Sequence, residues 1–193
     1  MNIAIDLNDV VRAHTAQFAK YYQKEVDRSF DIENVEVWTN DLKQIFPFPS
    51  EKAYYNFLYE DLAIELFGMA NTTAKNMSLV FKQWFEKMED LEEEPTFCFI
   101  STKEIDKSIG ASLFFLSKLA CKIGEVHMLW EEDLVWGKCD AIITANPNIL
   151  NNVPKNKKTI KINTPYNEEI QSEIAYDSFL ELTEDIKFFE KIK

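Results

Sequence analysis

Glycine and proline are scarce in this chain, which has four glycines and six prolines among 193 residues. Their scarcity excludes collagen-like and low-complexity chains, which are rich in one or both residues. Long apolar runs are also missing, because no uninterrupted apolar segment approaches the roughly 18 residues that span a bilayer. Residues 1–6 lack the basic region and long apolar stretch of a secretory signal. We therefore expect a cytoplasmic protein with no membrane partner.

Cysteine and basic residues are few as well. The three cysteines, Cys98, Cys121 and Cys139, are an odd number, and two of them fall in apolar runs typical of buried strands. We therefore expect reduced core thiols instead of a disulfide framework. The formal net charge of −12 repels phosphate backbones, and the nearest basic cluster, at residues 155–161, is typical of a solvated surface. No nucleic-acid partner is expected.

The chain is rich in the side chains that form a core. Hydrophobic residues make up 46% of it and aromatic residues 13%. A chain of this length can bury a substantial core in one domain, but it is too short for two full-sized domains. We expect one main folding unit with room for a small insert.

Apolar runs alternate with segments of helical periodicity along most of the chain. Strands are predicted near residues 3–5, 96–101, 125–129, 139–144 and 159–162. Helices are predicted from about 13 to 22, from 51 after a Ser50 cap, from 74 to 88, from 103 to 122, and from 176 to 192. This alternation predicts an α/β fold with a doubly wound parallel sheet, in which ligands bind at the carboxyl ends of the strands.

Polar side chains follow several of the predicted strands and should converge at that edge. They are Asp6, Asn8, Ser101, Thr102, Thr144, Asn146, Tyr166 and Asn167. An aspartate directly after a central strand is suited to nucleophilic attack on a phosphoryl group if a cation neutralises the gathered charge. It is equally suited to capping the helix that follows, and the spacing alone does not decide between the two roles.

The order of these segments resembles the haloacid dehalogenase superfamily. Residues 3–11, Ile-Ala-Ile-Asp-Leu-Asn-Asp-Val-Val, are similar to its first motif, and residues 97–101 resemble its second, a strand that ends in Ser or Thr. Residues 140–147 are similar to its acidic segment, and residues 159–167 resemble the strand that runs into Pro-Tyr-Asn in the deoxyribonucleotidase-like branch. The resemblance implies a Rossmann-like core of residues 1–11 and 73–193, with residues 12–72 forming a small helical cap inserted after the first strand.

The resemblance also implies roles for individual residues, and this chain departs from several of them. Asp6 occupies the position of the nucleophile, whereas Asn8 replaces the aspartate that acts as general acid and base. Loss of such a group typically costs about 10² to 10⁴ in rate. Thr144 and Ala145 replace an acidic pair, which leaves Asp6, the Asn8 backbone carbonyl and Thr144 to hold Mg²⁺. We expect Mg²⁺ binding to be weak or absent.

The phosphate site that the resemblance implies would use Ser101, Thr102 and Lys138. Ser101 and Thr102 precede a predicted helix whose amino end would favour an anion, but either residue could also be a simple helix cap. For Lys138 we favour an exposed lysine at the start of a strand, because its position departs from that of the family's phosphate-contacting lysine. The aromatic side chains of the cap could stack on a ligand or pack as the core of a small helical lobe.

Two functions from different classes are consistent with these residues. In the first, the chain is a catalytically impaired, nucleotidase-like pseudoenzyme that binds a small phosphorylated ligand or a protein partner, and it could form an oligomer. In the second, it is a slow magnesium-dependent phosphohydrolase that acts on nucleoside monophosphates or other small phosphate esters. We expect the first, because most of the positions that carry the chemistry are altered.

Overall fold

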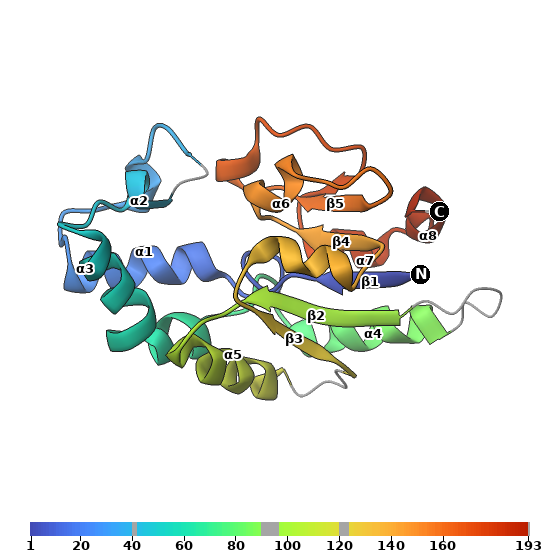
Figure 1. Cartoon of the computed structure of the whole chain (residues 1–193), viewed down its shortest axis with the longest axis horizontal. Coiled ribbons are helices and arrows are strands. Elements are labelled where there is room, and N and C mark those ends of the chain that lie inside the picture. The colour runs from blue at the N-terminus through green and yellow to red at the C-terminus, as the bar shows by residue number, and fades with distance from the viewer. Residues whose placement is uncertain (40–41, 90–96, 120–123, 193) are drawn as a thin grey trace.

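A single parallel sheet organises the molecule (Figure 1). The computed structural model describes residues 1–39, 42–89, 97–119 and 124–192. The strands are β1 (Asn2–Ile5), β2 (Phe97–Lys103), β3 (Val126–Leu129), β4 (Ala141–Thr144), β5 (Lys158–Ile162) and β6 (Ala175–Tyr176). They pair in the order β3-β2-β1-β4-β5-β6, and every pairing is parallel. The predicted doubly wound α/β fold is confirmed.

Helices and short helical turns connect the strands. The α-helices are α1 (His14–Glu25), α2 (Leu42–Ile45), α3 (Glu51–Tyr55), α4 (Met77–Glu89), α5 (Lys107–Lys118), α6 (Pro147–Asn151), α7 (Phe179–Glu184) and α8 (Phe188–Ile192). The 3₁₀ and π turns are η1 (Ile32–Asn34), η2 (Asn56–Asp61), η3 (Ile64–Gly68), η4 (Glu132–Gly137) and η5 (Pro165–Asn167). Since β1 is central and its carboxyl end leads into α1, the residues that follow β1 lie at the middle of the sheet edge.

Apolar side chains cover both faces of the sheet. In β1, Ile3 and Ile5 belong to the larger core cluster, which includes residues of α4, α5, α7 and α8. Ala4 points to the opposite face, because successive side chains of a strand alternate, and there it joins a smaller cluster with residues of η4 and α6. Both faces are therefore buried, as expected for a parallel sheet.

A third apolar cluster lies among the helices between β1 and α4. Aromatic rings form much of it, with centroids 4.6 Å apart for Phe18 and Phe46 and 5.3 Å apart for Tyr22 and Phe48. The aromatic residues of this cluster therefore pack against one another as the core of a helical lobe. Arg12 and Thr72, at the two ends of the predicted insert, are joined by an isolated antiparallel bridge. The division at residues 12 and 72 itself stays a prediction.

The end of the chain differs from its predicted form. The sequence predicts one helix over residues 176–192, but the structure has β6 followed by two short helices, α7 and α8. The hydroxyl of Ser178 accepts a hydrogen bond from the Glu181 amide at 3.1 Å and so begins a new helix there. Asp185 ends that helix and caps the next turn, because its carboxylate accepts the Lys187 amide at 2.8 Å. Local capping therefore divides the predicted helix.

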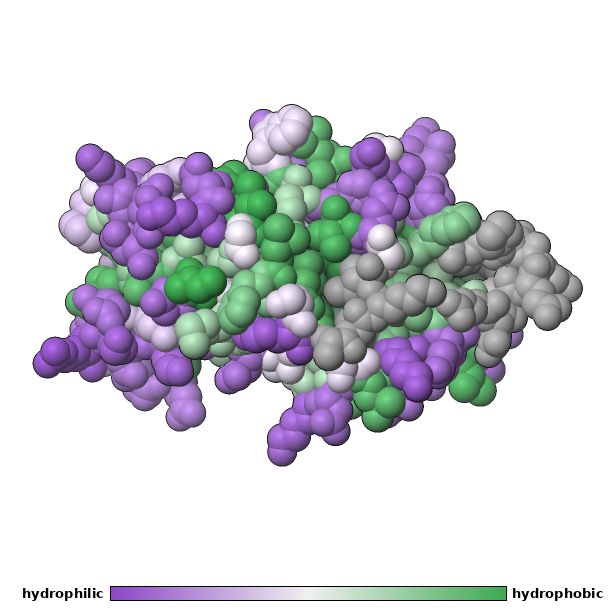
Figure 2. All heavy atoms as spheres, turned by 90° about the horizontal axis from the view of Figure 1, so that it is seen from below, coloured by the Kyte–Doolittle hydropathy of each residue, from purple (hydrophilic) through white to green (hydrophobic). Residues whose placement is uncertain are grey.

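The surface on the α5 side mixes polar and apolar side chains. Figure 2 shows hydrophobic surface through the middle of this face with hydrophilic surface around it. Exposed apolar residues on η3 and α5 include Ile64 and Leu113. None of the described helices combines the length and apolar character needed to cross a bilayer. Cys98 and Cys139 carry free thiols, as predicted, and Cys121 lies outside the described residues.

Candidate functional site

A cavity of about 520 Å³ opens at the carboxyl edge of the sheet. Residues that follow the strands form its polar side: Asp6, Asn8, Asp9, Ser101, Thr102, Lys103, Asn146, Asn148 and Tyr166. Helices of the predicted cap contribute aromatic and aliphatic side chains, including Tyr54, Leu58, Tyr59 and Phe67. The structure thus brings Asp6, Asn8, Ser101 and Thr102 together at one cavity. Its volume suits a small organic molecule.

Asp6 lies at the carboxyl end of β1 and is only 6% exposed. Its amide donates to the Ile143 carbonyl at 2.9 Å, and its carboxylate Oδ2 accepts the Thr144 hydroxyl at 2.9 Å. Burial raises the pKa of Asp6 from 3.8 to about 7, against the opposing effect of the Thr144 hydrogen bond. The carboxyl group is therefore about half protonated at neutral pH.

Thr144 lies beneath Asp6 at the end of β4 and is fully buried. Besides donating to Asp6, its hydroxyl oxygen accepts the Asn146 amide at 3.0 Å. Asn146 in turn accepts the Asn148 amide at 2.9 Å and caps α6. Thr144 therefore orients Asp6 and the loop after β4, and it is not among the residues that line the cavity.

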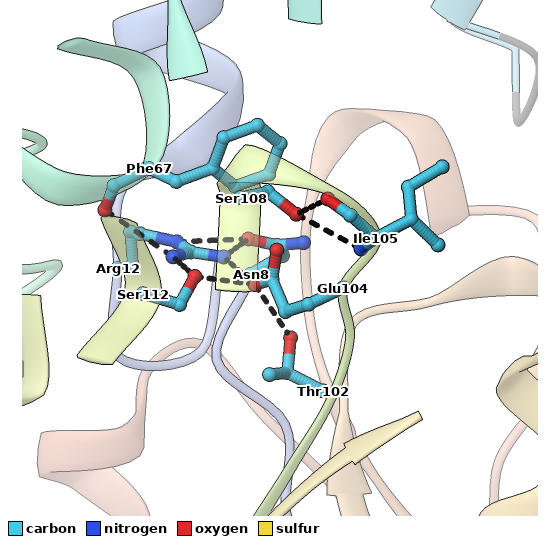
Figure 3. Close-up of polar contacts among 8 residues, drawn as sticks. All are labelled: Asn8, Arg12, Phe67, Thr102, Glu104, Ile105, Ser108 and Ser112. Atoms are coloured by element: carbon cyan, nitrogen blue, oxygen red, sulfur yellow. Dashed lines mark hydrogen bonds and ion pairs between the residues drawn. The ribbon is translucent and has the colours of Figure 1, made fainter. Parts of the chain in front are cut away.

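Asn8 is held by a buried arginine (Figure 3). The Asn8 Oδ1 atom accepts hydrogen bonds from Arg12 Nε at 3.0 Å and from Arg12 Nη2 at 2.6 Å. Arg12 is 0% exposed and stacks over the Phe67 ring at 4.9 Å. The side-chain oxygen at the predicted general-acid position is thus already used inside the protein.

Glu104 completes this polar network. Arg12 Nη2 donates to Glu104 Oε1 at 2.8 Å, and both side chains are fully buried. The Ser112 hydroxyl donates to the same oxygen at 2.6 Å and accepts from Arg12 Nη1 at 2.6 Å. Sequence reasoning missed Arg12 and Glu104. The available signal was a single arginine among apolar residues directly after the first motif, but nothing in the sequence identified its partner.

Asp9 is a second carboxylate at the cavity, in a left-handed conformation with φ of 56°. It accepts the Thr15 amide at 2.9 Å, the Thr15 hydroxyl at 2.5 Å and the Tyr166 hydroxyl at 2.8 Å. Burial raises its pKa, and these three donors oppose the increase. Because its lone pairs already serve these contacts, Asp9 acts as a structural link between β1, α1 and the Tyr166 loop.

Residues near Tyr166 support this arrangement. Asn167, which is 1% exposed, donates to the carbonyls of Ala145 and Ile162, both at 2.9 Å. It therefore ties the loop after β5 to the loop after β4. The polar side chains that were predicted to meet after the strands do lie near one another, although several of them bond to the protein itself.

The structure does not bring Lys138 to this cavity. Lys138 directly follows η4 and precedes β4, and it is exposed at the amino end of that strand. Lys103, at the carboxyl end of β2, lines the cavity instead. Its Nζ atom lies 3.6 Å from Glu132 Oε1, and Glu132 Oε2 accepts Asn148 Nδ2 at 3.0 Å. Lys103 is thus a basic residue at the cavity that sequence reasoning missed.

The residues at this edge offer few protein ligands to a divalent metal ion. Within the part of the chain that the structure describes, no group of three His, Cys, Asp or Glu residues is placed to hold a metal. Thr144 offers only a hydroxyl, which Asp6 and Asn146 already use. Mg²⁺ favours a near-octahedral set of oxygens and usually keeps several waters, and at this edge Asp6 supplies one carboxylate toward such a set.

The two histidines lie in surroundings that favour structural roles. His14 borders the cavity, and burial lowers its pKa from 6.5 to about 3, so its ring is neutral. It stacks on Phe67 with ring centroids 4.9 Å apart. His127 lies in β3, with its Nε2 atom 2.6 Å from Glu125 Oε1.

Comparison with known proteins supports the fold and assigns no function to the site. No protein-family model matches the chain, and no curated protein matches it. A solved structure from Burkholderia xenovorans LB400, described as a haloacid dehalogenase-like hydrolase, is similar with a TM-score of 0.53 over 100% of this chain and 98% of that one. Sequence identity is 9%, so the likeness concerns the fold alone. The protein has a haloacid dehalogenase-like, Rossmann-like α/β fold.

Proposed function

We propose that this protein binds a small molecule in the cavity at the carboxyl edge of its sheet and has lost phosphate-ester hydrolysis. It is a pseudoenzyme in this proposal, and the ligand is held between the strand ends and the helical cap. The observation that carries the proposal is the double hydrogen bond from Arg12 to the Asn8 side-chain oxygen. An amide held in this way cannot give a proton to a leaving group or take one from water.

The surroundings of Asp6 support the same conclusion. A nucleophilic carboxylate must be ionised, and a cation must offset the charge of an incoming phosphate. Burial raises the pKa of Asp6 to about 7, and none of the described lysine, arginine or histidine side chains forms an ion pair with it. Asp6 is therefore better suited to accept hydrogen bonds from a ligand than to attack one.

The cavity favours a small molecule over a protein partner. It is concave, has a volume of about 520 Å³ and combines a polar floor with aromatic walls. Sites with these features are typical of small ligands, whereas stable protein interfaces are broad and comparatively flat. This is the reason to place the function at the cavity.

The second candidate function is slow, magnesium-dependent hydrolysis of nucleoside monophosphates or other small phosphate esters. One observation favours it: Asp6 and Ser101 border the same cavity, as a nucleophile and a phosphate ligand would. The same two residues serve equally well as hydrogen-bonding groups for a ligand that is not hydrolysed.

Hydrolysis of p-nitrophenyl phosphate in the presence of Mg²⁺ separates these functions. We expect the wild-type chain to match the rate of the Asp6→Asn variant, because the proton-transfer group and the metal ligands are missing. An Asp133→Asn variant is the matched control, since Asp133 is an exposed aspartate that does not line this cavity. Magnesium-dependent turnover in the wild-type and control chains that disappears in Asp6→Asn would contradict the proposal.

A further inference from the structure

We propose that the ligand of this cavity carries a protonated amine on a planar, mostly apolar body. This inference rests on the proposed function and names the class of ligand for the same site. It differs from the phosphorylated ligand expected from sequence. Three features of the cavity support it: its buried acceptors, its charge balance and its aromatic walls.

The first feature is a pair of nearly buried polar groups with capacity for a ligand. Asp6 is 6% exposed, and Thr144 is the only described side chain that donates to its carboxylate, through Oδ2. Ser101 is 3% exposed, lines the cavity and uses its hydroxyl in none of the hydrogen bonds among the described residues. A buried polar group normally has a partner, so the Ser101 hydroxyl calls for one from outside, and the Asp6 carboxylate, which Thr144 and the Leu7 amide already contact, keeps acceptor capacity for the same ligand. An ammonium group has three donors and no acceptor, which matches a carboxylate and a hydroxyl oxygen.

The second feature is the charge around the cavity. Three carboxyl groups line it, those of Asp6, Asp9 and Glu132; Glu132 pairs with Lys103, which leaves Asp6 and Asp9 without an ion pair among the described residues. The two lysines that line the cavity already face carboxylates, since the Nζ atom of Lys43 lies 2.7 Å from Glu51 Oε2 and that of Lys103 lies 3.6 Å from Glu132 Oε1. A dianionic phosphate would enter this acidic site in a chain whose net charge is −12. Electrostatic repulsion disfavours such a ligand and favours a cation.

Arg12 does not change this balance. Its guanidinium group is 0% exposed and donates to Asn8, to the Phe67 carbonyl, to Ser112 and to Glu104. Glu104 neutralises its charge at 2.8 Å. A ligand in the cavity therefore meets no free arginine among these residues. Figure 3 shows that Arg12, Ser112 and Glu104 form hydrogen bonds with one another.

The third feature is the wall that the cap provides. Tyr54 and Tyr59 line the cavity from the cap, and Tyr166 lines it from the loop after β5, whereas the Phe67 ring already stacks with His14 and Arg12. Aromatic rings stack on planar ligands, and their faces also attract cations. Aliphatic side chains, including Leu58 from the cap and Ile149 from α6, also line the cavity. The body of the ligand would lie against this wall while its amine reaches Asp6 and Ser101.

A set of three ligands with one body tests the charge of the head group. The set is 5′-amino-5′-deoxyadenosine, adenosine and adenosine monophosphate, which carry an ammonium, a hydroxyl and a phosphate on the same planar, nucleoside-sized body. Isothermal titration calorimetry at pH 7.5 without Mg²⁺ would measure their Kd values. We expect the amine to bind at least about tenfold more tightly than either of the other two. Tyramine against 4-ethylphenol repeats the comparison on a smaller aromatic body.

Variants test whether Asp6 and Ser101 cause the preference for the amine. Asp6→Asn should reduce the affinity for the amine to that for adenosine, and Ser101→Ala should weaken amine binding by a smaller factor. Asp133→Asn should leave all Kd values unchanged, because it removes a nearby carboxylate that does not border the cavity. Circular dichroism of each variant verifies that it is folded before titration.

The outcomes separate this inference from the proposed function. Tighter binding of adenosine monophosphate than of the amine, without its hydrolysis, would overturn the amine and leave the ligand-binding function in place. Equal binding of the amine and its neutral analogue, or no binding of either amine, would also overturn the inference. Release of inorganic phosphate from the monophosphate would overturn the proposed function itself. Saturable binding of Mg²⁺ alone that Asp6→Asn abolishes would show that Asp6 receives a metal instead of an amine.

Discussion

Asn8 shows how one contact can decide what a residue is able to do. Replacing it with aspartate would restore the side chain that the general-acid position requires, yet Arg12 would still donate to the same oxygen from Nε and Nη2. A guanidinium group this close favours the ionised carboxylate and lowers its pKa. The restored group would therefore carry no proton to give at neutral pH. The amide and its arginine act together in blocking this position.

The first prediction is that Asn8→Asp does not gain phosphatase activity. We also expect it to lower the free energy of unfolding by about 1–3 kcal/mol, because Arg12 would then face two carboxylates, the buried one of its partner Glu104 and the new, half-buried one. Steady-state hydrolysis of p-nitrophenyl phosphate and urea denaturation measure the two effects. Adding Glu104→Gln removes the excess charge and should recover most of the lost stability. Measurable turnover in Asn8→Asp alone would contradict the role given to Arg12.

The second prediction concerns Asp6 and pH. Its pKa is about 7 in the folded protein, against 3.8 for an aspartate that is not buried, so the folded chain holds the proton more tightly than the unfolded chain. Stability is therefore lost as pH rises from about 4 to 7, and the full penalty is present above pH 7. The Asp6→Asn variant lacks this penalty. At pH 8 it should exceed the wild-type free energy of unfolding by on the order of 1–4 kcal/mol, and at pH 4 the difference should nearly vanish.

Urea denaturation of both chains at several pH values tests this prediction. Glu132 raises the pKa of Asp6 and Arg12 lowers it, but both remain in the variant, so the difference between the two chains isolates Asp6. A difference that stays constant from pH 4 to pH 8 would contradict the raised pKa.

At the scale of elements, η3 and α5 approach closely at Gly68. A Cβ atom added there would lie 3.2 Å from the Ala111 carbonyl oxygen of α5 and 2.9 Å from Ile64 Cδ1. The isoleucine side chain can move aside, but the helix backbone must shift by a few tenths of an ångström. The absence of a side chain at Gly68 therefore sets the distance between η3 and α5.

The third prediction is that Gly68→Ala lowers the free energy of unfolding by about 1–3 kcal/mol, as expected for overpacking at a tight contact. Thermal denaturation monitored by circular dichroism measures the loss. Gly110→Ala is the matched control, because a Cβ atom at that position of α5 meets nothing within 4 Å. Gly110→Ala should be neutral or stabilising, since alanine favours a helix over glycine. Equal destabilisation by both changes would contradict the close approach at Gly68.

The elements also show what the sequence allows to be predicted. Strands such as β2 and β4 were predictable because parallel strands buried on both faces form continuous apolar runs. The helix at residues 74–88 was also predicted close to its observed bounds, Met77–Glu89. The division of the last helix was missed because it depends on the local hydrogen bonds of Ser178 and Asp185. The periodicity of apolar residues indicates which face of a helix is buried, but it does not indicate where a capping residue ends one helix and begins another.

At the scale of the whole molecule, the candidate site was predictable in its position and less so in its contacts. Asp6, Ser101 and Asn146 were expected together because the carboxyl ends of parallel strands share an edge. The pairing of Arg12 with Glu104 joins residues 92 positions apart, and Lys103 replaces Lys138 at the cavity. Such pairings follow from the packing of the cap on the sheet, which no local pattern in the chain encodes.

The Arg12 network connects four parts of the molecule. Its guanidinium group donates to the loop after β1, to the Phe67 carbonyl of η3, to Ser112 of α5 and to Glu104 after β2. Phe67 belongs to the apolar cluster among the helices between β1 and α4, so the Arg12 network joins that cluster to the strand ends at a point next to the cavity. The position of the cavity wall therefore depends on it.

The fourth prediction follows from this connection. Arg12→Met should lower the free energy of unfolding by about 3–5 kcal/mol, because it leaves the buried Glu104 carboxylate without its cation. The double variant with Glu104→Gln should lose less than Arg12→Met alone, since no unpaired charge then remains inside the protein. Urea denaturation of the wild type, both single variants and the double variant gives the coupling energy directly. If the losses of the two single variants simply add, Arg12 and Glu104 contribute independently, and the cluster that contains Phe67 is held in place by its apolar contacts instead.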